Sequence, residues 1–351
     1  MKKKNLLAVL LFGLTAFPMQ LAYACTRVVY LGPDGMVITA RSMDWQTDLG
    51  SNLWSFPRGM KRDGAAGPNS IRWSSRYGSV ITAAFEACSA DGMNEKGLVA
   101  NLNYLAESVY PTPNTSDTRK PISVSAWLQY ALDNYATVNE AVTALQAEPL
   151  YVVAVATPDG HAGSVHLALS DATGDSAIFE YVGGKLVIHH GREYQVMTNS
   201  PVYDQQLALA AYWQQIGGTV MLPGTNRAAD RFTRASFYIN AIPKTAKATE
   251  AVASVFSVIR NCSVPLGIST SGQPNISSTI WRTVADHKNQ RYYFESTRSP
   301  SIFWVDLASI DFKESASVKR LEISDGSIHT GNAAGKFEKR EAFKFLSAEI
   351  K

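Results

Sequence analysis

Cys25 is the residue with the clearest chemical potential in this sequence, because a processing signal stands directly before it. Residues 2–4 are lysines, residues 6–17 form a mostly apolar run, and Ala22-Tyr23-Ala24 places small side chains at the positions that signal peptidase reads. This order is typical of a secretory signal peptide, and the apolar run is too short to span a bilayer. The sequence therefore predicts a leader over residues 1–24, export to the periplasm and a mature chain that begins at Cys25.

A cysteine at the first position of a chain carries a nucleophile and a base on one residue. The thiol reacts as thiolate, and its ordinary pKa of about 8.5 means that another group must accept the proton. The α-amino group, with a pKa of about 7.7–8.0, belongs to the same residue and is held near the thiol at little entropic cost. Such a pair suits attack on a carbonyl carbon, as in the hydrolysis of an amide bond.

Two charged residues are expected to lie beside the N-terminal cysteine. Strand-forming residues 28–31 and 36–40 flank the turn sequence Gly-Pro-Asp-Gly over residues 32–35, which predicts a β-hairpin. The hairpin would return Arg41 and Asp44 to the start of its first strand. An arginine there favours the thiolate, and a carboxylate there can orient the α-ammonium group. The alternative for both residues is a plain ion pair at a strand end.

A lipid anchor is the main alternative role for the cysteine, since lipoproteins are also modified at a cysteine that follows a signal peptide. Lipidation would block the thiol, and the protein would then be a periplasmic binding or structural protein and no enzyme. Lipoprotein signals favour a Leu-Ala-Gly sequence before the cysteine, whereas here Tyr23 is bulky and Ala22 replaces the leucine. The sequence thus favours ordinary cleavage.

Composition argues against several other classes of protein. Without the lysines of the leader, basic and acidic side chains are equal in number, which gives no support to a nucleic-acid partner. No further apolar segment is long enough to cross a membrane, and the six histidines and the cysteines lack metal-ligand spacing, so no cofactor is expected. Cys88 and Cys262 could pair in an oxidising compartment, but free buried thiols are the favoured interpretation.

The order of predicted elements indicates the α+β class. Strands, a helical region, further strands, helices and final strands follow one another, which suits packed, mainly antiparallel sheets with helices outside. Thr137 and Glu140 form a capping box inside the helical region. The expected strands are 79–85, 98–102, an antiparallel meander of 151–156, 164–169, 177–181 and 186–188, and then 280–286, 291–296 and 302–305, with a loop over 91–97 and helices over 122–146, 207–213, 228–238 and 248–259. One domain over residues 25–311 is expected, with a peripheral, polar tail over 312–351.

Four ordered motifs resemble the choloylglycine hydrolase and penicillin V acylase family of N-terminal nucleophile hydrolases. The resemblance spans roughly residues 25 to 305, and the signal peptide and motifs look most like the Gram-negative penicillin V acylases. Asp230 departs from the family pattern, in which serine is frequent. The motifs are Cys25 with Arg41 and Asp44, then Asn94-Glu95-Lys96-Gly97-Leu98 with Asn101-Leu102-Asn103-Tyr104, then Met197-Thr198-Asn199-Ser200-Pro201, and finally Leu222-Pro223-Gly224 with Asp230-Arg231-Phe232.

The resemblance implies a fold, a mechanism and a set of catalytic residues. The fold is the four-layer α-β-β-α sandwich of N-terminal nucleophile hydrolases, and no cofactor takes part. Cys25 attacks the amide, Asp44 orients its amine, and two arginines polarise the site. Asn199 donates its side-chain amide to the oxyanion, and Asn103 contributes through its backbone or its side chain, although neighbouring Asn101 competes for that role. The implied catalytic residues are Cys25, Arg41, Asp44, Asn103, Asn199 and Arg231.

The same resemblance implies substrates that join an apolar acyl group to a polar amine. Penicillin V is the preferred small-molecule substrate, with N-acyl-homoserine lactones and conjugated bile salts as alternatives. Met43, Trp45, Phe85 and Tyr104 are candidate walls of the acyl pocket, and ordinary core packing is the alternative for each. A homo-oligomer, namely a tetramer, is expected by resemblance. A papain-like thiol protease is disfavoured, because no Cys-Gly-x-Cys-Trp motif is present.

Overall fold

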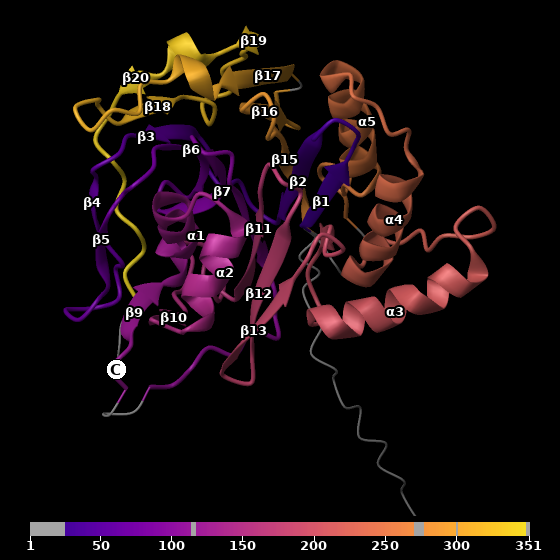
Figure 1. The fold of residues 1–351 in the computed structure, drawn as a ribbon, viewed down its shortest axis with the longest axis horizontal. Coiled ribbons are helices and arrows are strands. Elements are labelled where there is room, and N and C mark those ends of the chain that lie inside the picture. Colours follow the sequence, from indigo (N-terminus) through magenta and orange to yellow (C-terminus); the bar gives the residue numbers. More distant parts are fainter. Residues whose placement is uncertain (1–24, 114–116, 270–276, 300, 349–351) are drawn as a thin grey trace, which may run out of the picture.

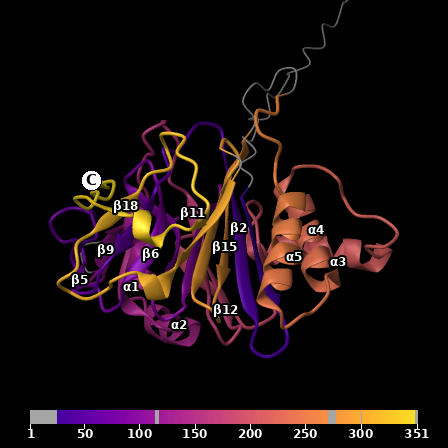
Figure 2. The same cartoon turned by 90° about the horizontal axis from the view of Figure 1, so that it is seen from above.

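Two large β-sheets packed face to face, with helices on both outer surfaces, make up the protein. The computed structural model describes residues 25–113, 117–269, 277–299 and 301–348. Figure 2 shows the layers in order, with α4 and α5 on one outer surface and α1 and α2 on the other. This is the predicted four-layer α-β-β-α sandwich. The expected leader, residues 1–24, lies outside the described residues.

A seven-stranded sheet carries the N-terminal hairpin near its centre. Its strand order is β14-β1-β2-β15-β16-β17-β19, and every residue of β2 is buried, since the strand has a neighbour on each side and a packed layer on each face. The hairpin forms as predicted, with Thr26 opposite Ser42 and Leu31 opposite Val37. The strands are β1 (Thr26–Leu31), β2 (Val37–Trp45), β14 (Val196–Met197), β15 (Ser278–Asp286), β16 (Arg291–Ser296), β17 (Ser301–Asp306) and β19 (Gly331–Asn332).

A nine-stranded sheet packs on the first one, in the order β13-β12-β11-β8-β7-β6-β3-β18-β20. Two short strand pairs lie apart from it, β4 with β5 and β9 with β10. The strands are β3 (Leu53–Phe56), β4 (Lys61–Asp63), β5 (Arg72–Ser74), β6 (Ser79–Ala84), β7 (Cys88–Asn94), β8 (Val99–Tyr104), β9 (Lys120–Ser123), β10 (Leu150–Val153), β11 (Val165–Ser170), β12 (Ser176–Val182), β13 (Lys185–His190), β18 (Lys319–Leu321) and β20 (Glu338–Lys339).

The helices cover the outer faces of the two sheets. α1 and α2 pack on the nine-stranded sheet, α4 and α5 pack on the seven-stranded sheet, and α3 packs against α4 (Figure 1). No helix within the described ranges is long and apolar enough to cross a membrane. The helices are α1 (Val124–Asn134), α2 (Val138–Gln146), α3 (Tyr203–Ile216), α4 (Ala228–Ala241) and α5 (Ala248–Asn261), with 3-10 turns η1 (Leu307–Ser309) and η2 (Ala334–Lys336).

The helical region predicted over 122–146 is two helices that meet at the capping box. Thr137 Oγ1 accepts a hydrogen bond from the backbone N–H of Glu140 at 3.2 Å, and the Glu140 carboxylate accepts one from the N–H of Ala136 at 2.8 Å. These contacts satisfy amide groups that have no partner inside α2. The capping signal therefore marks the true start of the second helix.

Two predictions about strands were wrong. The loop expected over 91–97 is largely strand, because β7 continues to Asn94 between β6 and β8. Its Asp-Gly pair, which is typical of a turn, here lies inside a strand whose residues are almost all buried. The meander consists of β11, β12 and β13 only, since β10 pairs in parallel with β9.

The segment from residue 312 belongs to the fold and is not peripheral. β18 extends the nine-stranded sheet beside β3, and Phe312, Leu321 and Phe337 are buried in a core with residues of both sheets. Its strands are two or three residues long. Elements this short show no hydrophobic period, so the sequence pattern could not reveal them.

Candidate active site

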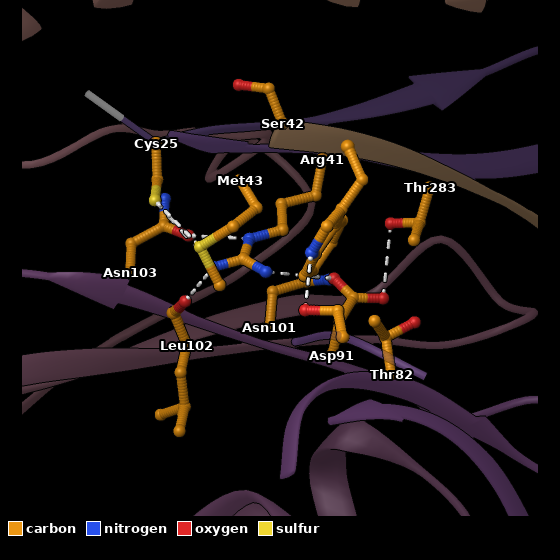
Figure 3. A network of polar contacts seen from close by, with 12 residues as sticks. Cys25, Arg41, Ser42, Met43, Thr82, Asp91, Asn101, Leu102, Asn103 and Thr283 are labelled. Atoms are coloured by element: carbon orange, nitrogen blue, oxygen red, sulfur yellow. Dashed lines mark hydrogen bonds and ion pairs between the residues drawn. The ribbon is translucent and has the colours of Figure 1, made fainter. Parts of the chain in front are cut away.

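The hairpin places the thiol of Cys25 beside the guanidinium group of Arg41. Cys25 Sγ lies 3.7 Å from Arg41 Nη2 and 3.8 Å from Met43 Sδ (Figure 3). The side chain of Cys25 is only 1% exposed, so water screens this contact poorly. The guanidinium group therefore places a positive charge against the sulfur of Cys25.

The nine-stranded sheet holds Arg41 in place. Arg41 Nη2 donates to the carbonyl of Leu102 at 2.5 Å, and Nε donates to Asn103 Oδ1 at 3.3 Å. The guanidinium also lies over the ring of Trp281, 4.8 Å from its centroid. Both sheets therefore fix the position of the charge that faces the thiol.

Asp91 is the buried partner that compensates the charge of Arg41. Its Oδ2 lies 3.9 Å from Arg41 Nη1 and accepts from Asn101 Nδ2 at 2.6 Å, while Oδ1 accepts from Tyr292 at 2.5 Å (Figure 3). Burial raises the pKa of Asp91, and Arg41 opposes that rise. Sequence analysis placed Asp91 in a loop and missed it. The available signal was the arginine itself, since a buried guanidinium needs a partner carboxylate.

Asp44 is a buried residue of β2 that lies close to Cys25. Thr279, which is opposite Asp44 on β15, donates to Asp44 Oδ1 at 2.5 Å, and the Asp44 backbone carbonyl lies 3.8 Å from Cys25 Sγ. Burial raises the pKa of Asp44 to about 6, although Arg231, Thr279 and Arg41 work in the opposite direction. The carboxyl group therefore titrates close to neutral pH.

Arg231 contacts the backbone of Cys25 and the residue that follows it. Its Nη1 donates to the carbonyl of Cys25 and to Thr26 Oγ1, both at 2.6 Å. Its Nη2 donates to Asn199 Oδ1 at 2.9 Å. Arg231 therefore joins the start of β1 to the asparagine that was predicted to bind the oxyanion. Burial lowers the pKa of Arg231, and the nearby carboxyl of Asp44 raises it.

The two predicted asparagines differ in the donors that they leave available. Asn103 Nδ2 donates to the carbonyls of Met197 at 3.4 Å and Thr198 at 3.0 Å, which occupies both of its hydrogens. Asn199 Nδ2 donates to the carbonyl of Tyr104 at 2.7 Å, which occupies one hydrogen of two. A direct contribution of Asn103 to an oxyanion would therefore come from its backbone, whereas the Asn199 amide has one N–H that no described residue accepts.

A buried histidine and glutamate support the segment that carries Asn199. His166, which pairs with Asn103 across β11 and β8, places Nε2 2.9 Å from the Thr198 carbonyl and Nδ1 2.8 Å from Glu180 Oε1. The other oxygen of Glu180 accepts from the N–H of Tyr203 at 3.0 Å, at the start of α3. One carboxylate thus holds both ends of the stretch between residues 198 and 203.

The surroundings of Glu180 keep its carboxyl group ionised. Burial alone would raise the pKa of Glu180, but contacts with His166 and His189 lower it to about 2. Sequence analysis found no metal-ligand spacing among the histidines and gave His166 no role. No motif marks His166, and only the strand register reveals its role.

An apolar pocket opens at the thiol of Cys25. It encloses about 660 Å³, including its mouth, and its lining is almost entirely apolar. The four predicted wall residues Met43, Trp45, Phe85 and Tyr104 all line it. Sequence analysis did not anticipate the remaining lining residues, which are Leu49, Ala84, Cys88, Ala90, Leu102, Val124, Ser125, Val155, Thr157, Ala162, Gly163, Val165 and Leu346 besides Cys25 and Arg41.

The cysteines at positions 88 and 262 are free, as is Cys25. Cys88 lines the apolar pocket and is half-buried, and burial raises its pKa to about 12. Cys262 is buried against α4, and burial raises its pKa to about 11. Both thiols are therefore poor nucleophiles near neutral pH. Within the described ranges, no group of three or more histidine, cysteine, aspartate or glutamate side chains is arranged to hold a metal ion.

The sequence profile of the linear amide C–N hydrolases, choloylglycine hydrolase family, matches residues 25–320. This chain belongs to that family. It is accordingly a hydrolase that acts on linear amide C–N bonds. The family match begins at the residue whose thiol opens into the pocket. It includes all six predicted catalytic positions and ends before the last thirty-one residues of the chain.

Individual members of the choloylglycine hydrolase family are similar to this chain over most of its length. The penicillin V acylase of Pectobacterium atrosepticum is 51% identical over 346 residues, which cover 92% of each chain. The solved penicillin V acylase of Agrobacterium tumefaciens is 56% identical with a TM-score of 0.85, covering 92% of this chain and 100% of its own. A bile acid hydrolase of Clostridium perfringens, at 22% identity and a TM-score of 0.74 over 88% of this chain and 98% of its own, shares the fold.

Proposed function

We propose that this enzyme hydrolyses the side-chain amide of penicillin V and related N-acyl compounds, with Cys25 as an N-terminal nucleophile. The observation that carries the proposal is the position of the Cys25 thiol, beside Arg41 and at the opening of an apolar pocket. A pocket with this apolar lining suits an aromatic or aliphatic acyl group. The two similar penicillin V acylases support phenoxyacetyl as that group.

The reaction proceeds through a thioester. The α-amine of Cys25 takes the thiol proton, and the thiolate forms a bond to the carbonyl carbon of the amide. Asn199 Nδ2 donates its remaining N–H to the oxyanion, and the proton passes to the leaving nitrogen as the C–N bond breaks. Water then adds to the thioester carbonyl, which releases the carboxylic acid and restores the thiol. Asp44 orients the α-ammonium group. Arg231 fixes the position of Asn199 relative to the Cys25 carbonyl, because it donates a hydrogen bond to each of them.

N-acyl-homoserine lactones are a second candidate substrate, because the apolar lining of the pocket also suits a fatty acyl chain. Conjugated bile salts have weaker support. The bile salt hydrolase/transferase of Clostridium perfringens is only 24% identical to this chain. Competition between penicillin V and a fatty acyl lactone for one site would show that both acyl groups use the same pocket.

The proposal includes removal of residues 1–24 and a periplasmic location. The start of the family match at Cys25 supports a mature chain that begins there. Burial of the Cys25 thiol argues against a lipid on its sulfur, because an anchored acyl group would have to leave the protein. Export through an ordinary signal peptide would expose the α-amine and so create the base.

Mass spectrometry of the secreted protein, before and after treatment with a thiol-reactive substrate analogue, tests the mechanism. We expect a chain that starts at unmodified Cys25, takes one label there and loses penicillin V hydrolysis. Cys25→Ser should lower kcat by about 10⁴-fold or more. Cys88→Ala is the matched control, since it also removes a pocket thiol but should still accept the label at Cys25. A lipidated Cys25, or a chain that starts elsewhere, would refute the mechanism.

We propose further that the enzyme is a homo-oligomer, namely a tetramer. α3 and the residues after it expose large apolar side chains, including Leu209, Tyr212 and Met221. Light scattering on the purified enzyme should give the mass of four chains, and Tyr212→Glu should shift that mass downward. A monomeric wild type would contradict the proposal.

A further inference from the structure

One wall of the apolar pocket comes from the C-terminal end of the chain. Leu346 lines the pocket together with Cys88, Val124 and Ser125, whereas Cys25 lines it from the N-terminal hairpin. In Figure 1 the yellow C-terminal segment descends to β9, while β1 and β2 lie nearer the centre of the view. Leu346 also lies beyond residue 320, where the family match ends.

Hydrogen bonds hold the backbone of Leu346 from two sides. Its N–H donates to the carbonyl of Ala87 at 3.1 Å, in the turn between β6 and β7. Its carbonyl accepts from Ser123 Oγ at 2.7 Å and from Ser125 Oγ at 3.2 Å, at the start of α1. Both polar groups of the residue are thus satisfied. The half-buried side chain is therefore kept against the pocket by a fixed backbone.

Aromatic contacts anchor the residues that precede Leu346. The ring of Phe343 lies 5.3 Å from Trp54 and 5.7 Å from Phe56, between centroids. The guanidinium of Arg62 lies over the ring of Phe345, 5.8 Å from its centroid. These contacts tie the segment from Phe343 to Leu346 to β3 of the nine-stranded sheet and to β4, so its position is set by packing as well as by hydrogen bonds.

We propose that Leu346 determines which acyl groups the enzyme accepts, because its side chain closes the apolar pocket on the side covered by the C-terminal segment. The inference rests on the proposed function, in which the acyl group occupies this pocket. A shorter side chain at position 346 leaves room for a longer or bulkier acyl group, and a larger one excludes such groups. One methylene group in an apolar pocket changes discrimination by about 10-fold or more.

Two measurements on Leu346→Ala and Leu346→Phe test this inference. The first is kcat/KM for straight-chain acyl amides of one amine, from acetyl to dodecanoyl, and for phenoxyacetyl. The second is calorimetric binding of the free carboxylic acids to the same variants made with Cys25→Ser, which needs no turnover. Leu186→Ala is the matched control, because Leu186 is also a partly buried leucine packed against the core but lies outside the pocket.

We expect Leu346→Ala to shift the preferred acyl length upward and Leu346→Phe to shift it downward, each by about 10-fold in the ratio of long to short substrates. Leu186→Ala should keep the wild-type preference. If all variants share one length preference while the wild type hydrolyses acyl amides, the inference is wrong and the proposed function stands. If the wild type hydrolyses none, the proposed function fails. The acid-binding preferences then decide the inference, since unchanged or absent binding overturns it.

Discussion

The two sides of the pocket are held together by different kinds of force. At Cys25, charged and amide groups meet at hydrogen-bond distance, as in the contacts of Arg231 with the Cys25 carbonyl and with Asn199. At Leu346, apolar side chains from separate parts of the chain meet without directional contacts between them. Hydrogen bonds depend steeply on distance and angle, whereas apolar contact depends mainly on shape and area. Substitutions on the polar side should therefore lower the catalytic activity, whereas substitutions on the apolar side should change which acyl groups the enzyme prefers.

Asn199→Ala provides the strongest test of the polar side. The change removes the amide that is expected to bind the oxyanion, and it leaves Arg231 Nη2 without its acceptor. We expect kcat to fall by about 10²–10³-fold with little change in KM, because the oxyanion exists only after attack. Steady-state kinetics with penicillin V measure both constants. Asn289→Ala is the control, because Asn289 lies in the turn between β15 and β16. It should leave kcat and KM unchanged. An equal loss in the two variants would contradict the assignment.

The pH profile tests the polar side through Asp44. Because burial raises the pKa of Asp44 to about 6, its carboxylate is lost as the pH falls through that value. Protonated Asp44 no longer carries the negative charge that holds the α-ammonium, so kcat/KM should fall by about tenfold per pH unit below the pKa. Asp44→Asn should be slow throughout and should lack this acidic limb. The same limb in the variant would show that another group titrates.

The free energy of unfolding should also depend on the protonation of Asp44, but it should rise as the pH falls, whereas kcat/KM should fall. The folded-state pKa of Asp44 lies above its ordinary value of 3.8, so the folded chain binds the proton more tightly than the unfolded chain does. The contribution of Asp44 to the free energy of unfolding is therefore favourable at low pH and is lost as the pH rises from about 4 to about 6. Chemical denaturation of Asp44→Asn and wild type across this range measures the difference, and the stability of wild type relative to the variant should rise as the pH falls. A constant difference would rule the linkage out.

Glu180→Gln tests whether the polar side depends on support from outside the pocket. The variant weakens two hydrogen-bonded connections of Glu180. One runs through His166 to the Thr198 carbonyl, and the other goes directly to the N–H of Tyr203. We expect kcat to fall by about 30-fold at unchanged KM, since Asn199 would lose its fixed position. Glu95→Gln is the control, because Glu95 is also a hydrogen-bonded carboxylate, held by Arg58 and the Gly78 N–H. A fall in melting temperature alone for both variants would reduce Glu180 to a structural role.

Phe85→Ala should have the smallest effect and sharpens the apolar side. Phe85 and Glu86 form the turn between β6 and β7 with φ of 57° and 50°, a conformation that usually selects glycine or asparagine. Glu86 holds this turn by accepting from Asn52 at 3.0 Å and Trp54 at 3.2 Å. Loss of the Phe85 ring should raise KM about tenfold and spare kcat, because the wall contacts substrate and transition state alike. A loss in kcat at constant KM would place Phe85 on the polar side.

The residues nearest the nucleophile could be predicted because they are close in sequence. A hairpin with a defined turn fixes which residues of its two strands meet, so Arg41 and Asp44 follow from Cys25 by local rules. Asn103, Asn199 and Arg231 came from the family resemblance, and the structure brings them to the same place. No sequence pattern could predict their contacts, such as the two hydrogen bonds that occupy the side-chain amide of Asn103.

The sequence by itself determined the N-terminal hairpin, the α+β class and the types of residue at the site. Propensity, turn chemistry and hydrophobic period act over a few residues, and those features are local. Only the tertiary structure decided that Asp91 balances Arg41, that Glu180 and His166 support Asn199, and that Leu346 closes the pocket. Each of these depends on sheet register or on packing between residues far apart in the chain. Strands of two or three residues and single buried charges leave no period from which such contacts can be predicted.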